Sequence, residues 1–164
     1  MARGLVWFRT DLRIDDNPAL SSALSQFEEV LAIYVFSEAQ WALHNESNIK
    51  QEFLINNLIL LEKSLAKLSI PLIAINTESY KTLPKDLCSL AVQQKIDHAF
   101  WNNEFGYNES KRDQISIDAL EKINIQTSQF NDQVVYPPGF LKTGQGNPFS
   151  VFTPFKRRWV ENFK

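Results

Sequence analysis

The chain has 164 residues, 44% of them hydrophobic, which is enough for one buried core and close to the usual size of a single domain. A net charge of −2 excludes a broadly basic surface for gripping nucleic acid. Four Lys and Arg residues against one Glu give residues 151–164 a charge of +3, which leaves −5 on residues 1–150. Any DNA contact is therefore expected after residue 150.

The sequence also predicts where the protein works. It begins directly with an apolar strand, without the charged stretch and apolar segment of a secretory signal. The longest apolar run, residues 30–36, is too short to span a bilayer. The single cysteine, Cys88, cannot form an internal disulfide, and its apolar neighbours predict a buried helical thiol. We therefore expect a cytoplasmic, reduced protein with no membrane contact.

Five short apolar runs alternate with helical patterns in the first part of the chain. The predicted strands are residues 5–8, 30–36, 72–75, 99–101 and 125–130. Strands that alternate with helices build parallel sheets with right-handed crossovers. The pattern predicts a three-layer α/β domain over residues 1–130, built on a doubly wound, Rossmann-like parallel sheet of about five strands.

Capping residues mark the predicted helices. Asn17 and Pro18 start a short helix, and Ser47 starts a long one. The long helix is expected to bury one leucine stripe: Leu54, Leu58, Leu61, Leu65 and Leu68. Asn108 is expected to cap a later helix, with Glu109 in the first turn, where a carboxylate is favoured. The predicted buried side of that helix is Ile115, Ala119 and Ile123.

The chain changes character after residue 130. Prolines and glycines in residues 136–139 and 143–148 forbid regular structure, which predicts a long connector. Thr153 and Pro154 then start a helix over residues 155–163 with Phe155, Trp159 and Phe163 on one face. We expect residues 131–164 to be a connector and the start of a helix that leads to a further domain, because this aromatic face has no obvious partner.

The loop after the first strand carries unusual charge. Residues 7–17 read WFRTDLRIDDN and contain no glycine, so this loop is neither a dinucleotide fingerprint nor a P-loop. Any ligand here would be held by side chains. Arg9, Asp11, Arg13 and Asp16 are equally suited to a structural ion-pair network that holds the turn.

In a doubly wound sheet, ligands lie beyond the carboxyl ends of the strands where the strand order reverses. The loops expected at that edge are residues 9–17, 37–46 and 102–107. They bring an aromatic ring, an imidazole, two amides and a carboxylate: Trp41, His44, Asn45, Asn108 and Glu109. This set suits a flat heterocycle with N–H donors. Each residue also has a structural interpretation, as a helix cap, core cover or surface hydrogen-bonding group. The spacing predicts no metal site and no catalytic nucleophile.

Four sequence blocks together resemble the DNA photolyase/cryptochrome family. They are residues 7–17 (WFRTDLRIDDN), 40–45 (QWALHN), 107–113 (YNESKRD), and 137–139 (PPG) through 151–156 (VFTPFK). These blocks look most like bacterial class I cyclobutane-pyrimidine-dimer photolyases, and the similarity runs through the whole chain in order.

The resemblance implies the antenna domain of a light-driven DNA repair enzyme, a deoxyribodipyrimidine photolyase. In that family an N-terminal α/β domain holds a light-harvesting pigment, and a helical C-terminal domain binds FAD and the damaged DNA. This chain resembles only the first part, so the resemblance implies no catalytic residues here. It further implies that FAD is bound by the parent protein rather than by this chain, and that damaged DNA is met only through the C-terminal domain.

The resemblance also implies a pigment site. Folate-binding members hold methenyltetrahydrofolate in a shallow cleft shared between the two domains. His44, Asn108 and Glu109 match the positions of the family that contact this pigment. A carboxylate at Glu109 can accept two hydrogen bonds from the 2-amino group and the ring N–H of a pterin. The first block, residues 7–17, looks instead like a fold determinant of the family.

Three alternatives stay open on the sequence. Other family members use deazaflavin or flavin in a related cleft, so the pigment is not fixed. A cryptochrome photoreceptor would share the domain, although residues 40–45 favour the repair enzyme. A stand-alone nucleotide-binding module of the same architecture would bind ATP or AMP, and the missing glycine-rich loop argues against it.

Overall fold

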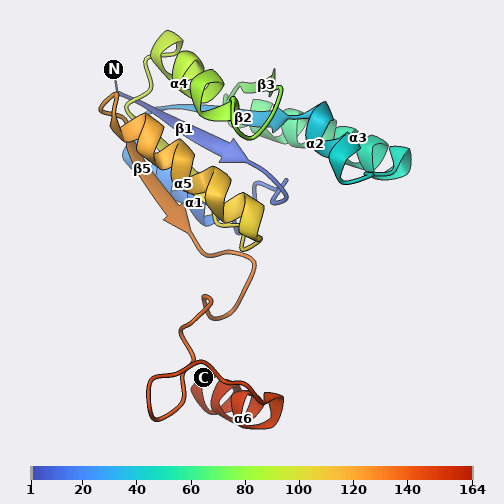
Figure 1. The fold of residues 1–164 in the computed structure, drawn as a ribbon. Helices are drawn as coiled ribbons and strands as arrows, with labels where there is room; N and C mark the ends of the chain where they lie inside the picture. Colours follow the sequence, from blue (N-terminus) through green and yellow to red (C-terminus); the bar gives the residue numbers. More distant parts are fainter. Residues whose placement is uncertain (1, 164) are drawn as a thin grey trace. The chain divides into compact units, whose positions relative to one another are not determined.

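The computed structural model describes residues 2–163, which form two compact units divided after Asp132. Five strands of the first unit pair in parallel in the order β3-β2-β1-β4-β5 (Figure 1). They are β1 (Arg3–Phe8), β2 (Glu29–Phe36), β3 (Leu72–Asn76), β4 (His98–Asn102) and β5 (Gln126–Phe130). The predicted doubly wound sheet is confirmed, because β2 and β3 extend the sheet on one side of β1 and β4 and β5 extend it on the other.

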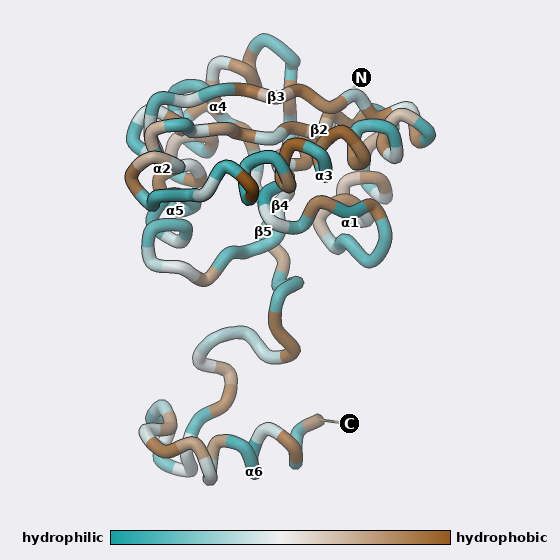
Figure 2. The backbone as a smooth tube through the Cα atoms, turned by 90° about the vertical axis from the view of Figure 1, so that its right-hand side faces the viewer, coloured by the Kyte–Doolittle hydropathy of each residue, from teal (hydrophilic) through white to brown (hydrophobic). Residues whose placement is uncertain are grey.

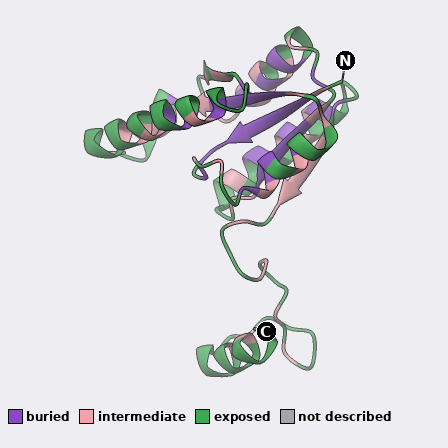
Figure 3. Ribbon diagram, turned by 180° about the vertical axis from the view of Figure 1, so that it is seen from behind, coloured by how far each residue is buried: buried purple, intermediate pink, exposed green. Residues whose placement is uncertain are grey.

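Helices cover both faces of this sheet, and the side chains of each strand alternate between them. The face with Val6 and Phe8 packs against α1 (Pro18–Gln26) and α3 (Asn48–Ala66). The face with Leu5 and Trp7 packs against α4 (Leu83–Gln93) and α5 (Tyr107–Glu121). The central strands are buried on both faces (Figure 3), as expected for a parallel sheet between two helical layers. Among the described residues, no helix is long and apolar enough to cross a membrane.

The leucine stripe of α3 is correct only in its central part. Leu58, Leu61 and Leu65 are buried, whereas Leu68 is 46% exposed. The helix ends at Ala66, so the chain leaves the helical path before Leu68 can continue the stripe. Apolar residues also occur on the solvent side of this helix, which therefore shows apolar stretches along its length (Figure 2).

The buried side of α5 was predicted wrongly. It consists of three polar side chains and one leucine: Arg112, Asp113, Ser116 and Leu120. The residues expected to be buried are half-buried or exposed: Ile115, Ala119 and Ile123. Charged groups replace apolar ones at the start of this helix because they find partners at the edge of the sheet, so their burial is compensated.

Cys88 is less buried than expected. It lies on α4, is partly exposed, and packs against the core cluster of that face. Burial raises the pKa of its thiol, which favours the protonated form.

The second unit contains the irregular segment and α6 (Phe152–Asn162). This helix begins three residues earlier than predicted, because Pro154 is tolerated in a first turn, where no N–H donor is needed. Aromatic contacts hold the unit together: Tyr136 stacks on Phe140 with ring centroids 5.2 Å apart, and Trp159 stacks on Phe163 at 4.9 Å. Tyr136 also meets Trp159 edge-on at 5.8 Å.

Candidate functional site

The candidate site lies at the carboxyl ends of β2, β1 and β4. Because β2 and β4 flank β1, the segments that follow these three strands emerge at the same edge of the sheet. The segment after β2 contains a short helix, α2 (Glu38–Leu43), that the sequence did not predict. The segment after β4 leads through Gly106 into the first turn of α5.

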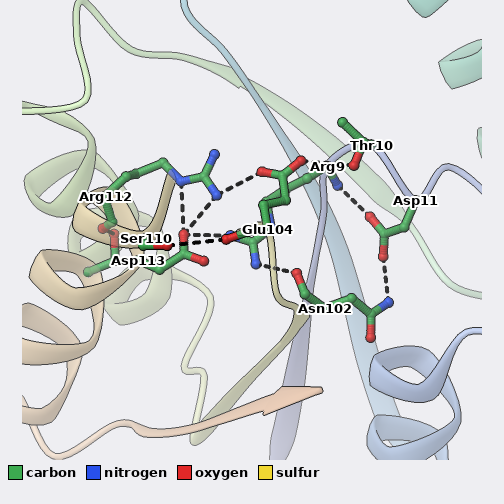
Figure 4. A network of polar contacts seen from close by, with 9 residues as sticks. Arg9, Thr10, Asp11, Asn102, Glu104, Ser110, Arg112 and Asp113 are labelled. Atoms are coloured by element: carbon green, nitrogen blue, oxygen red, sulfur yellow. Dashed lines mark hydrogen bonds and ion pairs between the residues drawn. The ribbon is translucent and has the colours of Figure 1, made fainter. Parts of the chain in front are cut away.

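Buried ion pairs occupy this edge below the surface (Figure 4). One carboxylate oxygen of Asp113, Oδ1, accepts hydrogen bonds from Arg9 Nη1 at 2.6 Å and from Arg112 Nε and Nη2 at 2.9 and 2.7 Å. Arg112 Nη2 also donates to Glu104 Oε2 at 2.9 Å, and Thr10 donates to Glu104 Oε1 at 2.8 Å. Both arginines and Asp113 are buried, so their charges are compensated mainly by each other.

A second set of polar contacts joins the first loop to β4. Asp11 Oδ1 accepts the backbone N–H of Arg9 at 2.8 Å, and Asp11 Oδ2 accepts Asn102 Nδ2 at 2.6 Å. Asn17 caps α1 by accepting the backbone N–H of Leu20, and it also accepts from Asn102 at 2.9 Å. These buried contacts fix the loop after β1 from both sides, so Arg9 and Asp11 hold the turn.

Burial and neighbouring charges shift the pKa values of the groups in this network. Burial lowers the pKa of Arg9, and the neighbouring cation of Arg112 adds to this effect against the pull of Asp113. Burial alone would raise the pKa of Glu104, but Arg112 and Arg9 outweigh it and the pKa is lowered. The aromatic face of Trp7 also stabilises both guanidinium groups, whose carbons lie 4.6 and 5.1 Å from the ring centroid.

The three predicted pigment residues lie at two ends of this edge. His44 is exposed and forms the C-cap of α2, after β2. Asn108 and Glu109 lie together in the first turn of α5, after β4. Within residues 2–163, no hydrogen bond or ion pair joins His44 to either of them.

The prediction that Asn108 caps α5 was wrong. The N-cap is Gly106, with extended backbone, so Asn108 is the second helical residue and Glu109 the third. The Glu109 side chain folds back over Gly106, since a Cβ atom at that glycine would lie 2.0 Å from Glu109 Oε2. Glu109 is half-buried, and its carboxylate receives no hydrogen bond from the described residues. The Glu109 carboxylate is thus held at a helix N-terminus, where a negative charge is favoured.

A shallow depression of about 360 Å³ lies beside α2. Its lining residues come from α2, the turn that follows it and the start of α3: Glu38, Trp41, Ala42, Asn45, Glu46 and Gln51. Trp41 packs edge-on against Phe36 at 5.6 Å and is half-buried, which agrees with the predicted role as core cover. No group of three or more His, Cys, Asp or Glu residues within the described chain could hold a metal ion.

Three residues near this edge were not assigned a role from sequence: Tyr80, Glu104 and Arg112. Arg112 and Asp113 stand on the side of an amphipathic helix that local spacing would leave to solvent. The sequence contains no local signal for their burial, because the arginines of the first loop have aspartates beside them as alternative partners. Tyr80 follows β3, outside the loops expected to meet at β1.

Comparison with known proteins identifies the relatives of this arrangement. A family model for DNA photolyase matches residues 4–164. A deoxyribodipyrimidine photo-lyase of Vibrio cholerae is 36% identical over 160 residues, and one of Escherichia coli is 34% identical over 165 residues. These alignments cover 98% and 100% of this chain but 34% of each relative. The chain therefore spans about a third of the length of these relatives.

Solved structures show the same fold. A class III photolyase from Agrobacterium tumefaciens superposes with a TM-score of 0.78 at 26% identity, over 99% of this chain and 32% of that one. A cryptochrome from Synechocystis superposes with a TM-score of 0.82 over 99% of this chain and 34% of that one, and at 22% identity it supports the fold alone. On the family match and the sequence identities, the chain belongs to the DNA photolyase family.

Proposed function

We propose that this chain is the light-harvesting antenna domain of a deoxyribodipyrimidine photolyase. In this proposal it binds methenyltetrahydrofolate through His44, Asn108 and Glu109, and passes excitation energy to FAD in a C-terminal domain of the same cytoplasmic protein. Repair of cyclobutane pyrimidine dimers, and contact with damaged DNA, would belong to that second domain. The curated relatives in Vibrio cholerae and Escherichia coli, both named deoxyribodipyrimidine photo-lyases, support this assignment.

The observation that carries the proposal is the carboxylate of Glu109. It is half-buried, held at the start of α5, and has no hydrogen-bond donor among the described residues. A pterin presents two parallel donors, its 2-amino group and the adjacent ring N–H, which match the two oxygens of a carboxylate. Charge-assisted bidentate pairs of this kind are about twice as strong as neutral hydrogen bonds and fix the orientation of the ring.

The other two residues fit the same ligand. Asn108 adjoins Glu109 and offers both a donor and an acceptor to the remaining polar atoms of the pterin. His44 is exposed after β2, where its imidazole can contact the far end of a flat ligand. When bound, the folate supplies absorption of near-ultraviolet light that the polypeptide lacks. The acidic lining beside α2 would repel the glutamate tail and direct it to solvent.

A stand-alone nucleotide-binding module is disfavoured by the contents of the crevice. The charged side chains below the sheet edge are already paired, Arg9 with Asp113 and Arg112 with Asp113 and Glu104. No glycine-rich loop lines it, so backbone N–H groups are not available to a phosphate. A cryptochrome antenna would share the fold, and the identities of 34–36% to curated photo-lyases favour the repair enzyme.

The test is a titration of the chain with methenyltetrahydrofolate, followed by absorbance and fluorescence, with FMN, a deazaflavin and ATP as competitors. Glu109→Gln is expected to weaken binding by roughly 1–3 kcal/mol, because one charged acceptor is lost from a partly buried pair. Glu121→Gln, an exposed change at the end of the same helix, is the matched control and should bind normally. Saturable binding of ATP without binding of folate would refute the antenna function.

A further inference from the structure

We infer that Tyr80 is a further specificity-determining residue of the folate site, whose hydroxyl donates a hydrogen bond to the ring carbonyl of the pterin. The inference rests on the proposed function of Glu109 and adds the donor that Glu109 cannot supply. The hydrogen-bonding edge of a pterin consists of two donors followed by one acceptor. A carboxylate satisfies the two donors but repels the carbonyl oxygen, so recognition of the whole edge requires a donor beside the carboxylate.

The position of Tyr80 meets this requirement. Arg112 lies one helical turn after Glu109, and residues three apart are neighbours on a helix surface. The guanidinium carbon of Arg112 lies 5.3 Å from the centroid of the Tyr80 ring. Tyr80 is half-buried, with its ring packed against the core cluster of α4 and α5. The Tyr80 ring therefore lies beside α5, on the side of the helix that carries Arg112.

The loop that carries Tyr80 is fixed by its own hydrogen bonds. Thr77 donates its hydroxyl to Asp86 at 2.6 Å, and its backbone N–H donates to the carbonyl of Phe36 at 2.8 Å. The Thr82 hydroxyl accepts the backbone N–H of Ser79 at 3.0 Å. The phenol is consequently placed before a ligand arrives, which lowers the entropic cost of using it.

The hydroxyl is available as a donor. In the described part of the chain, no hydrogen bond occupies the phenolic O–H of Tyr80. Burial raises the pKa of Tyr80, and the nearby carboxylates of Glu109 and Glu104 raise it further against the cation of Arg112. The group therefore keeps its proton at neutral and mildly alkaline pH. A phenolic donor beside a carboxylate acceptor complements the carbonyl and the two N–H donors of the pterin edge.

The test is Tyr80→Phe, which deletes one oxygen atom and keeps the packed ring. With methenyltetrahydrofolate as the probe, we expect about fivefold weaker binding, the loss of one neutral hydrogen bond. Infrared difference spectra of the bound pigment should show its ring carbonyl stretch at a higher frequency than in the unaltered chain. Tyr107→Phe is the control, because this tyrosine is 81% exposed at the first residue of α5 and should change neither quantity.

The outcomes separate the two claims. Equal affinity and an unchanged carbonyl frequency in Tyr80→Phe, while Glu109→Gln weakens binding, would overturn the role of Tyr80 and leave the antenna site intact. Failure of the parent protein, which contains both sides of the shared cleft, to bind folate would refute the antenna site, and the role of Tyr80 with it. A shift of the carbonyl band together with the loss of affinity would establish the hydrogen bond directly.

Discussion

The buried network predicts that Asp113→Asn severely destabilises the first unit. A single oxygen of Asp113 accepts three hydrogen bonds from two guanidinium groups, at 2.6, 2.7 and 2.9 Å. The amide keeps the shape but removes the carboxylate charge that both arginines contact, which leaves Glu104 to compensate two buried cations. Removal of one partner from a buried ion pair costs about 3–5 kcal/mol, because the remaining charge stays desolvated.

The assay is urea unfolding followed by circular dichroism and by tryptophan fluorescence, since Trp7 and Trp101 report on this core. A loss of 3–5 kcal/mol corresponds to a fall in Tm of roughly 6–20 °C for a chain of this size. The control is Asp118→Asn, an exposed position on α5 whose side chain accepts from Gln114 and should change stability by less than about 0.5 kcal/mol. A loss below about 1 kcal/mol for Asp113→Asn would show that the ion pairs are dispensable for the fold.

Two further predictions concern the start of α5 and the pH dependence of folding. Gly106→Ala is expected to weaken folate binding, because the new Cβ atom would displace the Glu109 carboxylate. Stability should change little, since alanine tolerates the extended backbone conformation at this position. Normal affinity in the same titration would contradict this prediction. Arg112 holds the pKa of Glu104 below its usual range despite burial, so the stability from this ion pair is present above the unfolded pKa and lost as the pH falls through the folded one. Urea unfolding between pH 7 and pH 3 should therefore show a steeper acid loss in the unaltered chain than in Glu104→Gln.

The architecture of the first unit could be predicted from sequence because it depends on local periodicity. Each predicted strand coincides with an observed one to within two residues at either end, and the strand order reverses at β1 as expected. The cap at Asn17 is confirmed, since its side chain accepts the backbone N–H of Leu20. Caps and apolar runs act over a few residues, so they can be recognised without knowledge of the rest of the chain.

The charged side of α5 could not be predicted in this way. Helical periodicity assigned its buried face to Ile115 and Ala119, whereas the structure buries Arg112 and Asp113. The reason lies 104 residues earlier in the chain, at Arg9, whose guanidinium requires an anionic partner. Local spacing contains no information about a contact over such a separation.

The candidate site divides along the same line. The sequence by itself determined the family resemblance, the α/β fold and the residues His44, Asn108 and Glu109 as pigment ligands, which remain a prediction. The tertiary structure decided that Gly106 rather than Asn108 caps α5, that the Glu109 carboxylate has no donor among residues 2–163, and that Tyr80 lies beside Arg112. Patterns of residues specify the local elements, whereas the packing of the sheet edge alone determines which polar groups satisfy one another and which remain available for a ligand.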